Sequence, residues 1–114
     1  MQSTTETINL GIVTFKEDDC FFVYCPSLDL IGYGYTEQEA NDSFNIVIDE
    51  YLKYTTEHGT LIADLEQRGW KIKDNRKKIT PPRLSDSLKR NNDLKNIINY
   101  NSFNKFDIPV GMPL

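Results

Sequence analysis

An alternating strand leads directly into a helix start in this sequence. Ile31, Tyr33 and Tyr35 alternate with Gly32 and Gly34. A strand at these positions places the large side chains on one face and only glycine on the other. A helix or a backbone segment must therefore approach the glycine face closely. The tyrosine face is either an interaction surface or ordinary packing, because tyrosine serves both purposes.

The helix that follows has clear start and end signals. Thr36 and Glu39 form a capping box, in which both side chains satisfy free amides at the helix start. His58 and Gly59 mark the end, because glycine accepts the left-handed cap conformation and a histidine suits the helix dipole. His58 is therefore interpreted as a cap residue. The apolar stripe that should cover the sheet comprises Ala40, Phe44, Val47, Ile48, Tyr51 and Leu52.

Two more strands precede this unit. In residues 8–15 the apolar side chains alternate first as Ile8, Leu10 and Ile12 and then, shifted by one position, as Val13 and Phe15. This shift predicts either a bulge or burial on both faces of the strand. A polar turn at 16–19 leads into residues 20–25, where both faces are apolar or aromatic, as in a central strand. Pro26 ends that strand because it lacks a backbone donor.

After the main helix, Thr60 can cap a shorter helix, and Trp70 and Ile72 predict a fourth strand. The order predicts an α+β fold: a three-stranded antiparallel meander plus a fourth strand, packed against one main helix.

Composition divides the chain into three parts. Residues 1–74 form the predicted α+β domain, and the polar residues 75–83, which include two prolines, form a linker. Residues 84–114 are predicted to hold two short helices, at 85–90 and 93–100, and an extended arm. Phe106, Ile108 and Val110 alternate along this arm, which can add to a sheet edge of its own chain or of another copy.

Charge is distributed unevenly along the chain. The net charge is −4, but residues 1–67 carry 2 Lys or Arg against 13 Asp or Glu, and residues 68–114 carry 11 against 4. The first part is thus at −11 and the second at +7. An acidic region can neutralise a basic partner, and a basic tail can contact phosphates. The alternative is that the two parts complement each other. The candidate DNA contacts are Arg76, Lys77, Lys78, Lys89 and Arg90.

No catalytic or metal-binding pattern is found. Cys20 and Cys25 lie five apart on one strand, so their side chains point to opposite faces and should not pair. Carboxylates at the predicted hairpin tip and on the solvent side of the helix do not converge. We expect no enzyme activity, no metal and no cofactor. Because the sequence has neither a signal-peptide pattern nor a long apolar run, we expect a cytoplasmic protein.

Two segments carry a family resemblance. Residues 22–29 read FVYCPSLD, and residues 34–40, at the helix start, read GYTEQEA. In this order the sequence resembles HicB-like antitoxins over residues 10–73. The resemblance implies a partial RNase H-like fold without the nuclease carboxylates. It also implies a domain of a toxin-antitoxin system that binds a small basic mRNA-cleaving toxin of the HicA type and often carries a DNA-binding segment that represses its operon.

The resemblance implies a toxin-binding surface, which we place on the strand at 31–35 and at the edge of the strand at 20–25. The candidate toxin-binding residues are Tyr24, Pro26, Asp29, Tyr33 and Tyr35. The terminal arm is the candidate contact of a homo-oligomer. A second hypothesis is a stand-alone homo-oligomeric interaction or scaffolding module without a toxin. An RNase H-like nuclease would need magnesium-binding carboxylates, and the sequence places none.

Overall fold

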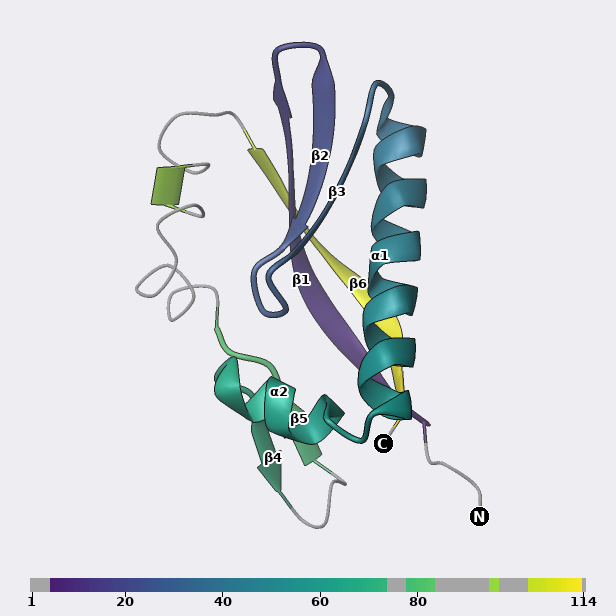
Figure 1. The fold of residues 1–114 in the computed structure, drawn as a ribbon. Coiled ribbons are helices and arrows are strands. Elements are labelled where there is room, and N and C mark those ends of the chain that lie inside the picture. Colours follow the sequence, from purple (N-terminus) through teal and green to yellow (C-terminus); the bar gives the residue numbers. More distant parts are fainter. Residues whose placement is uncertain (1–4, 74–77, 84–94, 97–102, 114) are drawn as a thin grey trace.

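The computed structural model describes residues 5–73, 78–83, 95–96 and 103–113, and it confirms the α+β class (Figure 1). Its elements in chain order are β1 (Thr5–Glu17), β2 (Cys20–Cys25), β3 (Leu30–Gly34), α1 (Glu37–Glu57), α2 (Leu61–Gln67), β4 (Lys71–Lys73), β5 (Lys78–Thr80) and β6 (Phe103–Pro113). Of the helices in the described part of the chain, none has the length and apolar character needed to cross a membrane.

The main sheet has the strand order β3-β2-β1-β6, and all its neighbours are antiparallel. The meander of β1, β2 and β3 is as predicted. The fourth strand of this sheet is β6, from the C-terminal arm, which pairs with β1 from Thr5↔Pro113 to Phe15↔Phe103. The segment around Trp70 does contain a strand, β4, but β4 pairs with β5 in a separate two-stranded sheet. Eleven paired residues give β6 a far longer ladder with β1 than the three residues of β4 could form.

β1 is buried on both of its faces. Leu10 and Ile12 belong to the core beside α1, whereas Val13 and Phe15, of the opposite phase, are also buried. The pairing with β6 continues through these positions without an interruption. Two-sided burial, and not a bulge, therefore explains the change of phase in the sequence.

α1 begins and ends where the sequence predicts. The Glu39 amide donates to the Thr36 hydroxyl at 3.1 Å, and the Glu39 carboxylate accepts from the Tyr35 amide at 2.8 Å. The last helical residue is Glu57, and Gly59 has a φ of 64° in the left-handed region. The buried stripe comprises Ala40, Phe44, Ile48, Leu52 and Thr55. Thr55 was not predicted, and the predicted Val47 and Tyr51 are half-buried at the border of the stripe.

The glycines of β3 lie directly beneath α1. A Cβ atom built on Gly32 would be 2.3 Å from the backbone nitrogen of Phe44, and one on Gly34 would be 2.4 Å from Cβ of Glu39. No side chain fits at either position. The predicted close approach to the glycine face is therefore confirmed, and α1 is the element that makes it.

α2 and β4 are attached to the main body by buried contacts. Trp70 is buried, and its Nε1–H donates to the backbone oxygen of Ser27 at 2.9 Å. Tyr51 of α1 donates its hydroxyl to Asp64 of α2, and Arg68 Nε contacts the same carboxylate oxygen at 2.8 Å. These contacts hold the short helix against the C-terminal half of α1.

The C-terminal strand is part of the core. Met112, near the end of β6, is fully buried in the cluster that contains Leu52 of α1. Strand β5 lies within residues 75–83, which the sequence predicts to be a linker. Most of the two predicted helices at 85–90 and 93–100 lies outside the described residues.

Candidate protein-binding site

Two of the candidate interface residues are strongly exposed. Tyr33 is 64% exposed, on the face of β3 opposite α1, and Tyr35, directly after β3, is 79% exposed. Tyr33 continues a row of rings across the sheet: its centroid lies 6.4 Å from that of Phe22, which stacks on Phe15 at 5.0 Å. β3 thus ends this row with an accessible aromatic side chain that also carries a hydroxyl.

The other three candidates lie around the β2–β3 connection. Tyr24 is buried, and its hydroxyl donates to Asp29 Oδ1 at 2.6 Å. Asp29 itself is exposed and has a φ of 54°, in the left-handed region. Pro26 is half-buried and lines a small cavity of about 230 Å³ together with Pro81 and other residues. The Tyr24 side chain therefore stabilises the loop by its hydrogen bond, and the exposed candidates are Asp29, Tyr33 and Tyr35.

The remaining candidates fall in different places. Phe106, Ile108 and Val110 pair with β1 of their own chain, opposite Ile12, Leu10 and Ile8. Lys78 lies in β5. The other candidate DNA contacts, Arg76, Lys77, Lys89 and Arg90, lie outside the described residues.

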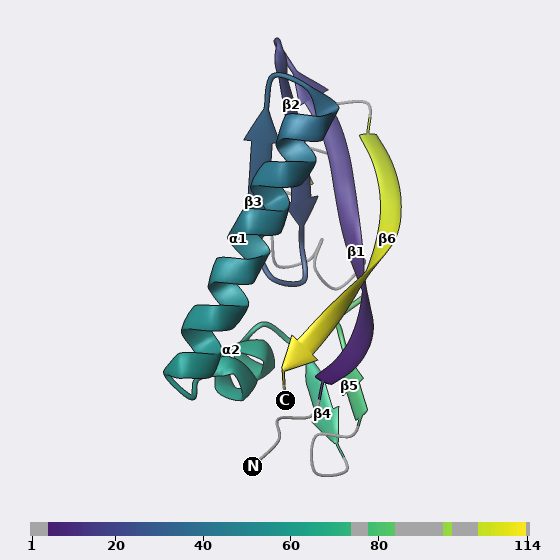
Figure 2. The same ribbon diagram turned by 90° about the vertical axis from the view of Figure 1, so that its right-hand side faces the viewer.

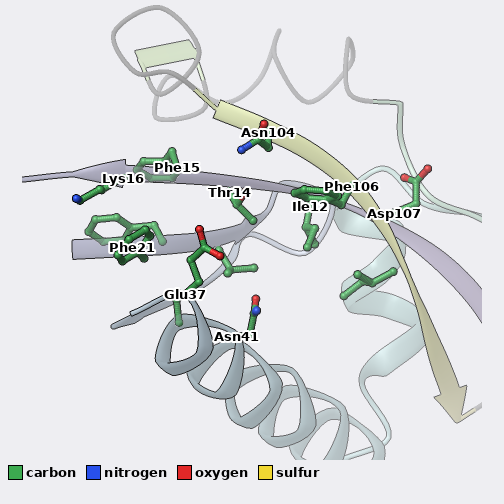
Figure 3. A pocket seen from close by; sticks show the side chains of 14 residues that line it. Ile12, Thr14, Phe15, Lys16, Phe21, Glu37, Asn41, Asn104, Phe106 and Asp107 are labelled. Carbon is green, nitrogen blue, oxygen red and sulfur yellow. The ribbon is translucent and has the colours of Figure 1, made fainter. Parts of the chain in front are cut away.

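A groove on the helix side of the sheet is the feature that the sequence did not reveal (Figure 3). It has a cavity volume of about 520 Å³ and lies between the first turns of α1 and strand β6, with β1 and β2 as its floor. Its lining residues are Ile12, Thr14, Phe15, Lys16, Phe21, Phe22, Val23, Glu37, Ala40, Asn41, Asn104, Phe106, Asp107 and Ile108.

The groove exists because α1 crosses the sheet at an angle. Its first turns lie over β3, where Gly32 and Gly34 admit them. At the other end, Leu52 packs in one cluster with Met112 of β6. Figure 1 shows α1 and β6 converging toward their C-terminal ends and separating toward the start of α1. Figure 2 shows β6 on the outer side of β1, away from β2 and β3. Among the residues that the structure describes, no element covers this face of β1 and β6 at the separated end.

Apolar and charged groups share the groove. Figure 3 shows Glu37 and Asn41 projecting from α1 toward the strands, with Asn104 and Phe106 on β6. The side chain of Asp107, opposite Gly11, lies on the other face of the sheet. The largest exposed apolar surface on the β6 side belongs to Phe106, which is 52% exposed.

The exposed side of α1 is acidic. The helix carries six carboxylates and one lysine, all on exposed residues. The carboxylates are those of Glu37, Glu39, Asp42, Asp49, Glu50 and Glu57. Two large apolar side chains, Ile46 and Tyr54, are exposed among them, and Tyr54 stacks on His58 with ring centroids 4.1 Å apart. Six of the thirteen carboxylates of residues 1–67 thus lie on one accessible helix.

The ionisable groups with shifted pKa values have structural partners. Burial raises the pKa of the Cys25 thiol, whose sulfur lies 3.4 Å from the Ser27 hydroxyl. Burial also raises the pKa of Tyr51, and its hydrogen bond to Asp64 raises it further. Burial alone would raise the pKa of Asp64, but hydrogen bonds from Tyr51 and Arg68 and the charge of Arg68 lower it.

Both cysteines are free, as predicted. Within the described ranges, no three His, Cys, Asp or Glu side chains come together in a way that could hold a metal ion.

Comparison of the chain with protein-family models, with curated proteins and with solved structures finds no match. The groove beside α1, the acidic helix and the exposed tyrosines of β3 are therefore the features on which a function must be argued.

Proposed function

We propose that this protein is a cytoplasmic binding protein that sequesters a small basic partner, of the mRNA-cleaving HicA toxin type. The observation that carries the proposal is the acidic exposed side of α1, which lies next to accessible apolar and aromatic surface. The sequence resemblance to HicB-like antitoxins supports the choice of partner. The proposal assigns no catalysis to this chain.

The charge of α1 suits a partner that binds RNA. A protein that contacts phosphates carries Lys and Arg on its binding surface. A helix with a net charge of −5 attracts such a surface and speeds the encounter, while burial of aromatic side chains supplies most of the affinity. Tyr33 and Tyr35 offer that burial, because each is large, mostly exposed and able to donate a hydrogen bond.

The test begins with a pull-down of the tagged protein from its own cells. Bound proteins are resolved by mass, separated under denaturing conditions, refolded and assayed for RNA cleavage. We expect a small basic protein whose ribonuclease activity appears only after it is separated from this chain. Recovery of no such protein, together with no gene for one beside this gene, contradicts the proposal.

Charge reversal tests the role of α1. Asp49→Lys should slow association with the partner several-fold, with a dependence on salt, because steering charges act mainly on the association rate. Glu66→Lys makes the same change in net charge on α2 and is the matched control. Equal effects of the two variants would show that only overall charge matters.

Two further roles remain predictions. No strand pairs with the outer edge of β6 among the described residues, so a homo-oligomer can form by pairing there. Sedimentation of the full chain over a range of concentrations measures this. Binding of operator DNA through the basic residues is tested by electrophoretic mobility shift with DNA from upstream of the gene.

A further inference from the structure

We propose that β6 pairs antiparallel with β6 of a second copy of this chain, in one register centred on Phe106. The inference rests on the homo-oligomer role given above, which it makes specific, and it does not depend on the toxin partner. β6 is the last strand of the main sheet, and no described strand pairs with its outer side.

The odd-numbered residues of β6 direct their backbone amides away from β1. Pro109 and Pro113 both pair with β1, at Asn9 and Thr5, although a proline cannot donate to a ladder. They must therefore occupy positions whose backbone groups face outward, and this direction alternates from one residue to the next. The amides at the outer edge are those of Phe103, Lys105, Asp107 and Gly111.

A hydrogen bond at the opposite edge gives the same alternation. The Tyr33 amide points away from β2, because it donates to Ser43 of α1. Tyr33 lies in one row with Phe22 and Phe15, and the row ends at Phe103 of β6. Along such a row, hydrogen-bonded and non-hydrogen-bonded pairs alternate from strand to strand. The amide of Phe103 therefore also points outward.

The two prolines limit pairing to the first half of the outer edge. They remove amides from the second half, and prolines on edge strands are known to resist pairing. Residues 103–107, in contrast, are all exposed, and each outward position among them has an amide. We therefore expect a second copy to pair with this first half.

Charge selects Phe106 as the centre of the pairing. When two copies of β6 run antiparallel about Phe106, Lys105 of each copy faces Asp107 of the other. Facing opposite charges stabilise a strand pair, and facing like charges destabilise it. A centre at Lys105 or Asp107 would place two lysines or two aspartates opposite each other. A centre at Asn104 would place Lys105 opposite Phe103 and would leave both charges without a counter-charge.

The same register brings the two Phe106 rings together on the other face of the sheet. Phe106 then faces its own copy in a non-hydrogen-bonded pair, where Cα atoms lie about 4.5 Å apart and side chains are close. The ring is 52% exposed, and the first turns of α1 stand away from it. Facing aromatic side chains stabilise strand pairs, so this contact adds to the two charge pairs.

Charge exchange tests the register in solution. The dissociation constant of the dimer of the full-length chain is measured by analytical ultracentrifugation. Lys105→Asp and Asp107→Lys each create facing like charges and should weaken the dimer at least about tenfold. The double variant restores opposite charges in both pairs and should recover the wild-type affinity. Lys71→Asp, at an exposed position of β4, is the control and should change nothing.

Cross-linking tests the centre. Phe106→Cys places two thiols at facing positions, within the Cα separation that a disulfide accepts, so mild oxidation should give a covalent dimer. Asn104→Cys lies on the same face but meets Ile108 of the second copy, and it should not be cross-linked. Wild type, with the free thiols of Cys20 and Cys25, is the blank. Circular dichroism confirms that each variant is folded.

Different failures can be told apart. A chain that sediments as a monomer at every concentration overturns both the register and the homo-oligomer role. A dimer that the double variant does not restore, or equal cross-linking of Asn104→Cys and Phe106→Cys, overturns the register alone. Failure to recover a toxin overturns the antitoxin role and leaves the dimer measurements to decide the register.

Discussion

Helix α1 lies close to one edge strand of the main sheet, β3, and its first turns stand away from the other edge strand, β6. At β3, α1 lies against Gly32 and Gly34. Side chains of α1 also accept hydrogen bonds from backbone amides at this edge: Ser43 Oγ accepts from the Tyr33 amide at 3.2 Å, and the Glu39 carboxylate accepts from the Tyr35 amide. At β6, the first turns of α1 stand away from the strand and leave the groove. One edge is closed and the other is accessible.

The side chains beneath the helix explain this difference. Glycine allows the helix backbone to approach, whereas Ile12, Phe106 and Ile108 on β1 and β6 hold a helix at side-chain distance. An exposed edge strand invites pairing with other chains, and occupied amides prevent it. The closed edge therefore stabilises the fold, whereas among the described residues no helix covers the start of β6.

The largest effect is expected from Gly32→Ala. The new Cβ would meet backbone atoms of Phe44, which cannot rotate away, so α1 must shift. We expect a loss of about 4 kcal/mol in the free energy of unfolding, above the usual range for overpacking. Urea unfolding measures it. Gly11→Ala is the control, because its nearest neighbour would be Asp107 Oδ1 at 3.8 Å. A similar loss in both variants would contradict the closed edge.

Two substitutions on β6 compare its anchored end with its open end. Met112→Ala removes a fully buried side chain and should cost about 3 kcal/mol of unfolding free energy. Phe106→Ala removes a half-exposed ring and should cost less than about 1 kcal/mol. Chemical unfolding of both variants tests the contrast. If Phe106→Ala is the more destabilising, the groove is part of the core and not an open site.

Ser43→Ala should open the β3 edge at one point. It leaves the Tyr33 amide without its hydroxyl partner, at a cost of about 1 kcal/mol. Hydrogen exchange of that amide should become faster, while the Tyr35 amide, held by Glu39, keeps its rate. Unchanged exchange at Tyr33 would mean that Ser43 does not protect the edge.

The smallest effect concerns pH and the far end of α1. The pKa of Asp64 is lowered in the fold from its ordinary value of 3.8. Its stabilisation is therefore fully present above that value and is lost as the pH falls through 3.8 toward the folded-state pKa. Because the pair with Arg68 is partly exposed, we expect less than about 1 kcal/mol.

Asp64→Asn should flatten this acid dependence without changing hydrogen exchange at the β3 edge. Unfolding of wild type and variant between neutral and acidic pH measures the first part. An unchanged acid dependence would show that Asp64 does not titrate as the structure implies.

The candidate site was only partly predictable. The cover on the glycine face follows from the alternation of Tyr33 and Tyr35 with glycine. The exposure of the two tyrosines did not follow, because tyrosine on a strand serves packing as well as binding. The burial of Tyr24 could not be foreseen, since it depends on the left-handed turn that brings Asp29 to its hydroxyl. The groove had no sequence signal either, because its walls on α1 and β6 are more than 60 residues apart in the chain and meet only through the pairing of β6 with β1.

Local chemistry by itself determined the meander, both ends of α1, its buried stripe and the close approach at Gly32, because each depends on neighbours within a few residues. The tertiary structure alone decided which segment became the fourth strand of the main sheet. An alternating, proline-containing segment such as β6 suits any edge position. Its place beside β1 was settled by an eleven-residue ladder and by the burial of Met112.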